Sequence, residues 1–196
     1  MTGRQASVSR TTKETEIDIC IDIDGSGKAD ISTGIPFFDH MLTAFCVHGF
    51  FDLELKVKGD LEVDYHHTIE DTGLVLGQAL SKALEKKEQI VRFGDSCVPM
   101  DEALSRVTID LSNRPYLVYN FPSNLKVKGT FDIDLAREFF QSFCVQGAFN
   151  LHINSEYGIN EHHVLESIFK ALGRSLKMAT RVDTNINKTL STKGTL

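Results

Sequence analysis

Two stretches of this chain occur twice, in the same order, and that repetition limits the folds it can adopt. The segment AFCVHGFFDLEL (44–55) aligns with SFCVQGAFNLHI (142–153), with identity at six of twelve positions. The segment HHTIEDTGLVLGQAL (66–80) aligns with HHVLESIFKALGRSL (162–176), with identity at six of fifteen positions. The offset between copies changes only from 98 to 96, which a two-residue deletion in the intervening loop explains. We therefore predict an internal duplication.

Each repeat mixes strand and helix patterns. Residues 15–24 alternate between isoleucines and mostly acidic residues, which is typical of a half-buried antiparallel strand. Pro36 fits the first turn of a helix that runs to about His48 and ends at Gly49. The other expected strands are 28–33, 52–57, 61–63, 103–111, 116–121 and 151–154, and the other expected helices are 68–87, 135–146 and 164–179. This pattern predicts an α+β fold in which two similar sheet-plus-helix halves pack as one two-layer unit.

Length and composition set further limits. A chain of 196 residues fits a single domain, with repeat 1 over about 8–90, repeat 2 over about 91–180 and a C-terminal tail over 181–196. The net charge of −6 argues against nucleic-acid binding. No apolar run approaches the roughly 18 residues of a membrane span, and the polar start gives no sign of a signal peptide. The four cysteines lack CxxC spacing, so we expect buried, reduced thiols and a cytoplasmic protein.

Each repeat carries the pattern HHxxE, at 66–70 and at 162–166. On a helix, Glu70 lies four residues after His66 and three after His67, so the three side chains share one side, within about 100°. Imidazole and carboxylate groups without a thiolate suit a borderline divalent metal. Adjacent histidines diverge by about 100° around a helix, so each HH pair is expected to serve two different ions. We therefore predict a metal role for both copies.

Further candidates lie outside the two motifs. His40, in PFFDHM on the preceding expected helix, is a candidate third ligand that residue type alone does not decide. Cations and hydroxyls in or beside expected loops are Arg92, Arg114, Ser191, Thr192 and Lys193. Arginine suits bidentate phosphate contacts and lysine supplies a point charge, although composition alone favours solvated surface residues here. No Walker-type phosphate loop is present.

Together these residues resemble the imidazoleglycerol-phosphate dehydratase family of histidine biosynthesis, from about Arg10 to Gly194. The segments that carry the resemblance are RTTKET (10–15), GIPFFDHML (34–42), HHTIEDTG (66–73), RFGD (92–95), PMDEALSRVTIDLSNRPYL (99–117), FDIDLAREFFQSF (131–143), EHHVLESIFKALGRSL (161–176) and STKG (191–194). The double HHxxE combined with FDHML and STKG is highly specific.

The resemblance implies a metal-dependent enzyme that converts D-erythro-imidazole-glycerol phosphate to imidazole-acetol phosphate and water, with two divalent ions per active site, usually manganese. By motif, the implied metal ligands are His40, His66, His67, Glu70, Glu138, His162, His163 and Glu166. The implied phosphate and substrate contacts are Arg92, Arg114, Ser191, Thr192 and Lys193. Glu14, in TKET, is the implied acid/base residue and also a substrate contact. The resemblance further implies a shell of twenty-four identical chains built from trimers, with metal sites shared between subunits.

Three positions depart from the family pattern. Glu138 stands where the family often has histidine; because a carboxylate can also ligate, the site is expected to survive. Tyr65 stands where aspartate is common before HH. Asn113 stands where glycine usually precedes the arginine, and asparagine tolerates left-handed backbone, so the turn is expected to hold.

Two other readings of the same residues remain open from the spacing. One is a dinuclear metallohydrolase that acts on a phosphorylated small molecule through a metal-bound hydroxide. The other is a metal-storage shell of His/Glu helices, as in ferritin-like bundles, which the strand patterns at 15–24, 103–111 and 116–121 disfavour. The loop arginines and STKG favour a phosphate-bearing substrate, but spacing alone does not separate hydrolase from dehydratase.

Overall fold

The computed structural model describes residues 3–122, 125, 131 and 133–194. Its strands are β1 (Gln5–Thr11), β2 (Thr15–Asp22), β3 (Ala29–Ser32), β4 (Asp52–Gly59), β5 (Phe93–Met100), β6 (Ala103–Asp110), β7 (Tyr116–Asn120) and β8 (Asn150–Tyr157). Its helices are α1 (Pro36–Gly49), α2 (His66–Leu84), α3 (Ile133–Gly147) and α4 (Glu161–Thr180). Among the described residues, half 1 (β1 to α2) and half 2 (β5 to α4) therefore share the order β-β-β-α-β-α, which confirms the predicted repeat.

The sheets of the two halves have the same topology. The strand order is β1-β2-β4-β3 in half 1 and β5-β6-β8-β7 in half 2. In each sheet the first three strands in spatial order pair antiparallel, and the last one, β3 or β7, adds in parallel at the edge. Isoleucines 17, 19 and 21 of β2 are buried while alternate residues face outward, as the alternation predicts.

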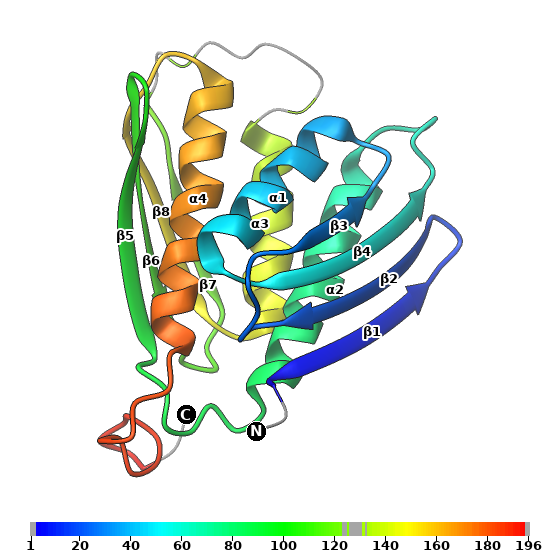
Figure 1. Ribbon diagram of the computed structural model, residues 1–196. Helices are drawn as coiled ribbons and strands as arrows, with labels where there is room; N and C mark the ends of the chain where they lie inside the picture. The colour runs from blue at the N-terminus through cyan, green and yellow to red at the C-terminus, as the bar shows by residue number, and fades with distance from the viewer. Residues whose placement is uncertain (1–2, 123–124, 126–130, 132, 195–196) are drawn as a thin grey trace.

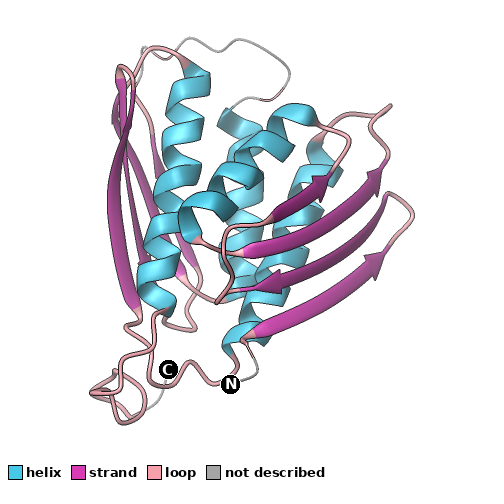
Figure 2. Cartoon of the chain, in the orientation of Figure 1, coloured by secondary structure: helices cyan, strands magenta, loops and turns pink. Residues whose placement is uncertain are grey.

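The helices lie between the two sheets (Figure 2). Each half is a sheet layer with a helix layer, and the halves pack helix against helix. The expected two layers therefore describe each half, whereas the whole chain has its sheets outside and its helices inside. All four helices begin at the same end of the molecule, and the C-terminal tail lies at the opposite end, where α4 finishes (Figure 1).

The helices of one half pack on those of the other through glycines that are identical in the two repeats. A Cβ on Gly77 of α2 would lie 2.6 Å from the carbonyl oxygen of Phe143 on α3. A Cβ on Gly173 of α4 would lie 2.3 Å from the carbonyl oxygen of Phe45 on α1. Because only glycine allows backbones to approach this closely, α2 pairs with α3 and α4 pairs with α1. The second pairing brings α1 alongside α4, which matters for the site.

Some expected elements were wrong or missed. Residues 61–63, expected as a strand, form a turn that leads into α2. Strands β1 and β5 were not predicted, because each buries only one residue, Val8 in β1 and Gly94 in β5. Pro99 is tolerated in β5 because β5 is an edge strand, where a missing backbone N–H can face away from the sheet.

The cysteines are free thiols, as expected. Cys46 and Cys144 are buried in the helix layer, and burial raises the pKa of the Cys144 thiol to about 11. Cys97 is exposed on β5, which differs from the expectation that the thiols are buried. Within the described part of the chain, the helices are too short or too polar to cross a bilayer.

Candidate metal centre and anion pocket

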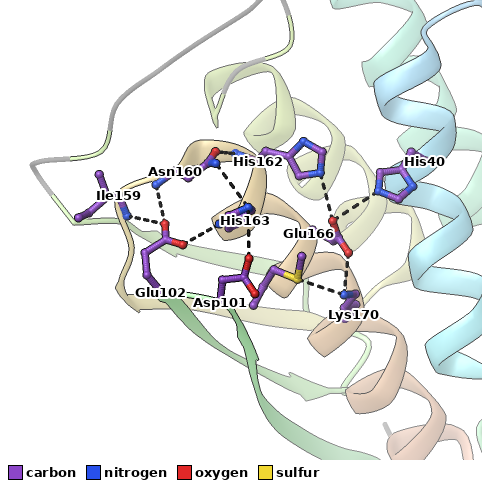
Figure 3. Close-up of polar contacts among 10 residues, drawn as sticks. His40, Asp101, Glu102, Ile159, Asn160, His162, His163, Glu166 and Lys170 are labelled. Atoms are coloured by element: carbon purple, nitrogen blue, oxygen red, sulfur yellow. Dashed lines mark hydrogen bonds and ion pairs between the residues drawn. The ribbon is translucent and has the colours of Figure 1, made fainter.

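His40, His162 and Glu166 form a cluster in which ligand atoms from two halves converge (Figure 3). Glu166 Oε2 lies 3.1 Å from His162 Nε2 and 3.4 Å from His40 Nε2. One potential ligand atom from each residue lies within 4.8 Å of the others. Among the described residues this is the one such trio of metal-binding side chains. The α1–α4 pairing thus places a histidine of half 1 beside the HHxxE motif of half 2.

Glu166 is held in place by a lysine as well as by the two histidines. Lys170 Nζ lies 2.6 Å from Glu166 Oε1, one helical turn further along α4. Burial by itself raises the pKa of Glu166, but the Lys170 ammonium and the hydrogen bonds from His40 and His162 outweigh it and lower the pKa overall. Glu166 is therefore ionised and oriented before any ion binds.

His163 points away from this cluster, as the divergence of adjacent histidines predicts (Figure 3). Its Nδ1 lies 2.6 Å from Glu102 Oε2, and Glu102 Oε1 accepts hydrogen bonds from the backbone N–H groups of Ile159 and Asn160. The bond from His163, followed by these backbone bonds, lowers the pKa of Glu102 to about 2. The Nε2 atom of His163 lies 3.8 Å from Asp101 Oδ2. A carboxylate on Nδ1 is the usual support for a histidine that ligates through Nε2.

The HHxxE motif of half 1 has a looser arrangement. His66 Nε2 and Glu70 Oε2 are 3.7 Å apart, and both side chains are more than 40% exposed. The repeat offset of 98 places Glu138 of α3 at the position that corresponds to His40 of α1. Within the described residues, Glu138 pairs with Arg137 at 3.6 Å and forms no ion pair or hydrogen bond with His66 or Glu70.

His67 has the same kind of support as His163. Its Nδ1 lies 3.0 Å from Asp60 Oδ2, and that hydrogen bond is the main cause that raises the pKa of His67. Glu14, in the turn between β1 and β2, lies close on the other side of the ring, with Oε1 3.9 Å from His67 Nε2. The structure thus brings Glu14, remote in sequence, beside one of the HHxxE motifs.

The donor set fits a divalent cation. Histidine nitrogens and carboxylate oxygens converge without a thiolate, which suits metals of the manganese to zinc series. The cluster supplies three ligands, fewer than such an ion takes, so further donors have to come from outside it. His67 and His163 offer Nε2 atoms that do not belong to the cluster.

The residues expected to contact phosphate line one pocket of about 870 Å³. They are Arg92, Arg114, Ser191, Thr192 and Lys193, together with tail residues from Asn185 onward. Arg92 is fixed by Asp110, which accepts from Nε at 2.7 Å and from Nη2 at 3.1 Å, and by the Leu190 carbonyl at 2.6 Å. Arg114 is 65% exposed. The pocket therefore pairs a cation held by hydrogen bonds with an exposed one, which suits an anionic group.

This pocket and the His–Glu cluster lie at opposite ends of α4. The tail that lines the pocket follows the end of α4 (Figure 1), whereas His162 and Glu166 lie in its first turns. The backbone N–H of Arg92 donates to the carbonyl of Ala179, near the end of α4. His162 and Ala179 are separated by about 25 Å along the helix axis, at 1.5 Å per residue. A single copy of the chain thus does not bring all the predicted site residues together.

Sequence reasoning missed three partners of the predicted ligands, namely Asp60, Glu102 and Lys170. Glu102 is 61 residues from His163 and Asp60 is seven from His67, so no helical spacing reveals either contact. Lys170 follows Glu166 at the i,i+4 spacing of a helical ion pair, a signal that the sequence did contain.

Comparison with known proteins identifies the family of this chain. Residues 33–176 match the family model described as imidazoleglycerol-phosphate dehydratase. An imidazoleglycerol-phosphate dehydratase from Desulfosudis oleivorans is 53% identical over 97% of this chain and 98% of its own length, and one from Syntrophobacter fumaroxidans is 53% identical over 98% of both.

Two solved structures are similar to this one. The crystal structure of imidazoleglycerol-phosphate dehydratase from Staphylococcus aureus has a TM-score of 0.81 at 37% identity, covering 91% of this chain and 99% of its own. The crystal structure of the Pyrococcus furiosus protein in complex with (S)-C348 has a TM-score of 0.84 at 36% identity, covering 96% of this chain and 100% of its own. On family model, sequence and fold alike, the chain belongs to the imidazoleglycerol-phosphate dehydratase family, a family of hydro-lyases in histidine biosynthesis.

Proposed function

We propose that this dehydratase is metal-dependent and converts D-erythro-imidazole-glycerol phosphate to imidazole-acetol phosphate and water with two divalent ions, manganese in the first place, per active site. The observation that carries the proposal is the convergence of His40, His162 and Glu166. Such ions supply Lewis acidity and orientation to an imidazole-bearing substrate when bound. The residues that would hold them are His40, His66, His67, Glu70, Glu138, His162, His163 and Glu166.

The active site is shared between subunits in this proposal. The support is the separation of about 25 Å between His162 and the Arg92 loop, which one chain cannot close. Each second histidine, His67 or His163, has its Nδ1 held by a carboxylate and offers Nε2 outward, as a ligand for a neighbouring copy does. Such sharing fits self-association into a shell of twenty-four chains built from trimers.

Two groups of residues act on the substrate itself. The Arg92–Arg114–Lys193 pocket holds the phosphate and so fixes the reacting carbons relative to the metal centre of a neighbouring subunit. Glu14, whose side chain is 54% exposed, moves the proton that the elimination requires. The free cysteines fit a reducing cytoplasm as the place of action.

One assay tests the activity and separates it from the hydrolase reading. The protein is incubated with manganese and imidazole-glycerol phosphate, and products are followed for an enolisable ketone and for inorganic phosphate. Ketone without phosphate release is expected. Phosphate release without ketone would support a metallohydrolase instead. Equal turnover in protein that elemental analysis shows to be metal-free would refute the metal dependence.

A second experiment tests the shared sites. Metal that bridges subunits adds its binding free energy to their contacts, so removing it is expected to lower the mass in solution. Light scattering of chelated protein, checked by elemental analysis, measures this. If the metal-free protein keeps its full assembly size, assembly does not depend on metal binding and the coupling is refuted.

A further inference from the structure

The loop between α2 and β5 contains a lysine whose ammonium group is enclosed by protein. Lys87 is 3% exposed, whereas its neighbours Lys86 and Glu88 are exposed. Lysine is almost never this buried unless its charge has partners. Burial lowers the pKa of Lys87 to about 8, against the attraction of Asp110. A solvated surface role therefore does not explain this residue.

The Lys87 ammonium joins two other segments of the chain. Its Nζ donates to the Asn113 side-chain oxygen at 2.7 Å, to the Ala148 carbonyl at 3.0 Å and to the Gly147 carbonyl at 3.2 Å. Gly147 ends α3, and Asn113 lies in the turn between β6 and β7. The three N–H groups thus match three acceptors. Lys87 ties the β6–β7 turn to the end of α3.

Asn113 directly precedes Arg114, the exposed arginine of the anion pocket. Asn113 has φ 59°, a left-handed conformation that constrains the direction in which the chain continues. The Arg114 carbonyl accepts a hydrogen bond from the Asn150 side chain, and its N–H donates to Ser112 Oγ at 3.3 Å. Within the described part of the chain, the side chain of Arg114 is anchored by just a 3.4 Å bond to the Ser112 carbonyl and a 3.8 Å approach to Asp110. Its reach into the pocket therefore depends on the backbone of this turn.

We propose that Lys87 is a positioning residue for the substrate phosphate: by holding Asn113 against the end of α3, it fixes the turn from which Arg114 reaches the anion pocket. The inference rests on the proposed function, in which Arg114 contacts the phosphate. A loosened turn has to be ordered when substrate binds, which weakens binding and raises KM. Because Glu14 and the metal ligands lie elsewhere, kcat is retained.

Two variants of the assembled, manganese-loaded enzyme test the proposal. Asn113→Gly allows the left-handed backbone and removes the acceptor, while Lys87→Met keeps side-chain length and removes the donor without changing the backbone of the turn. Each is expected to raise KM roughly fivefold to tenfold, the size of one net hydrogen bond, with kcat within about twofold of the parent. Lys86→Met, an exposed neighbour, is the matched control and should leave KM unchanged.

A double variant shows whether Lys87 acts through Arg114. In an Arg114→Ala background, Lys87→Met or Asn113→Gly should raise KM no further, because the side chain being positioned is already absent. A KM that rises equally in both backgrounds would overturn the proposal. So would a lower thermal midpoint with unchanged KM for Asn113→Gly, which indicates a purely structural contact. If Arg114→Ala alone leaves KM unchanged, the phosphate role of Arg114 fails and this inference fails with it.

Discussion

The two HHxxE motifs lie at the starts of α2 and α4 but have different surroundings. In half 2, Glu166 is 10% exposed and contacts His40, His162 and Lys170. In half 1, Glu70 is 41% exposed, and among the described residues it forms an ion pair with His66 alone, at 3.7 Å. The repeat offsets place Glu138 at the position of His40 and Leu74 at the position of Lys170. Within the described residues, the half 2 cluster is therefore assembled in the isolated chain, whereas in half 1 only His66 and Glu70 approach each other.

The second histidine of each pair shows the opposite behaviour, because carboxylates lie near both of its ring nitrogens in both halves. A hairpin-turn acid lies 3.9 Å from His67 Nε2 and 3.8 Å from His163 Nε2, Glu14 in the first case and Asp101 in the second. The carboxylate on Nδ1 comes from different places, Asp60 after β4 and Glu102 between β5 and β6. Duplication thus preserved the position of this histidine while the residues around it changed.

The largest effects are expected for these second histidines. If each HH pair serves two ions, His67→Ala and His163→Ala should each lower the metal content and nearly abolish turnover, because each would remove a metal ligand. Elemental analysis and steady-state turnover measure this, with His152→Ala, an exposed histidine of β8, as the control. Full metal occupancy with normal activity in either variant would break the equivalence of the halves.

A smaller loss is expected for the hairpin acid of half 1. Glu14→Gln keeps size and hydrogen bonding but loses the base, so turnover should fall at least about a hundredfold, the scale of general acid–base help. Assembly, metal content and substrate binding should persist. Glu16→Gln, an exposed acid of β2, is the control, and Asp101→Asn is the matched variant in half 2. A Glu14→Gln enzyme within a few fold of the parent would assign the proton transfer to another group.

The next largest effect is expected for the anion pocket, which has no full counterpart among the described residues of half 1. Arg4 precedes β1 as Arg92 precedes β5, and each forms a two-point contact with an aspartate, Asp24 or Asp110. Only Arg92 shares its pocket with Arg114. Arg114→Ala should raise KM and spare metal content, at a cost of roughly 1.5–3 kcal/mol for a charge-assisted contact. Arg4→Ala should not change KM; a matching rise would make the two arginines equivalent.

The smallest effect concerns stability without metal. Glu166→Gln leaves Lys170 without its partner in a largely buried site, so the free energy of unfolding should drop by roughly 1–3 kcal/mol. Glu70→Gln changes an exposed residue, and its effect should stay within about 0.5 kcal/mol. Urea unfolding of metal-free protein measures both. Equal losses would contradict the view that only the half 2 cluster is assembled in advance.

The sequence by itself determined whatever depends on local periodicity and on repetition. Alternation predicted β2 and its buried isoleucines, and helical spacing predicted that His162 and Glu166 share one side of α4. The repeated letters predicted two halves of one plan, and the glycines common to both, such as Gly77 and Gly173, turned out to be the helix contacts. Local geometry suffices here because a helix or strand fixes which neighbours share a face.

Tertiary structure alone decided which remote groups meet. Spacing cannot show that His40 reaches Glu166 across 126 residues, since that contact depends on the close packing of α1 on α4 through Gly173. Nor can it show that Glu102 supports His163, or that the arginine pocket lies at the end of the molecule opposite the motifs. Periodicity stops at the end of each element, and beyond it the arrangement follows from which buried surfaces pack together.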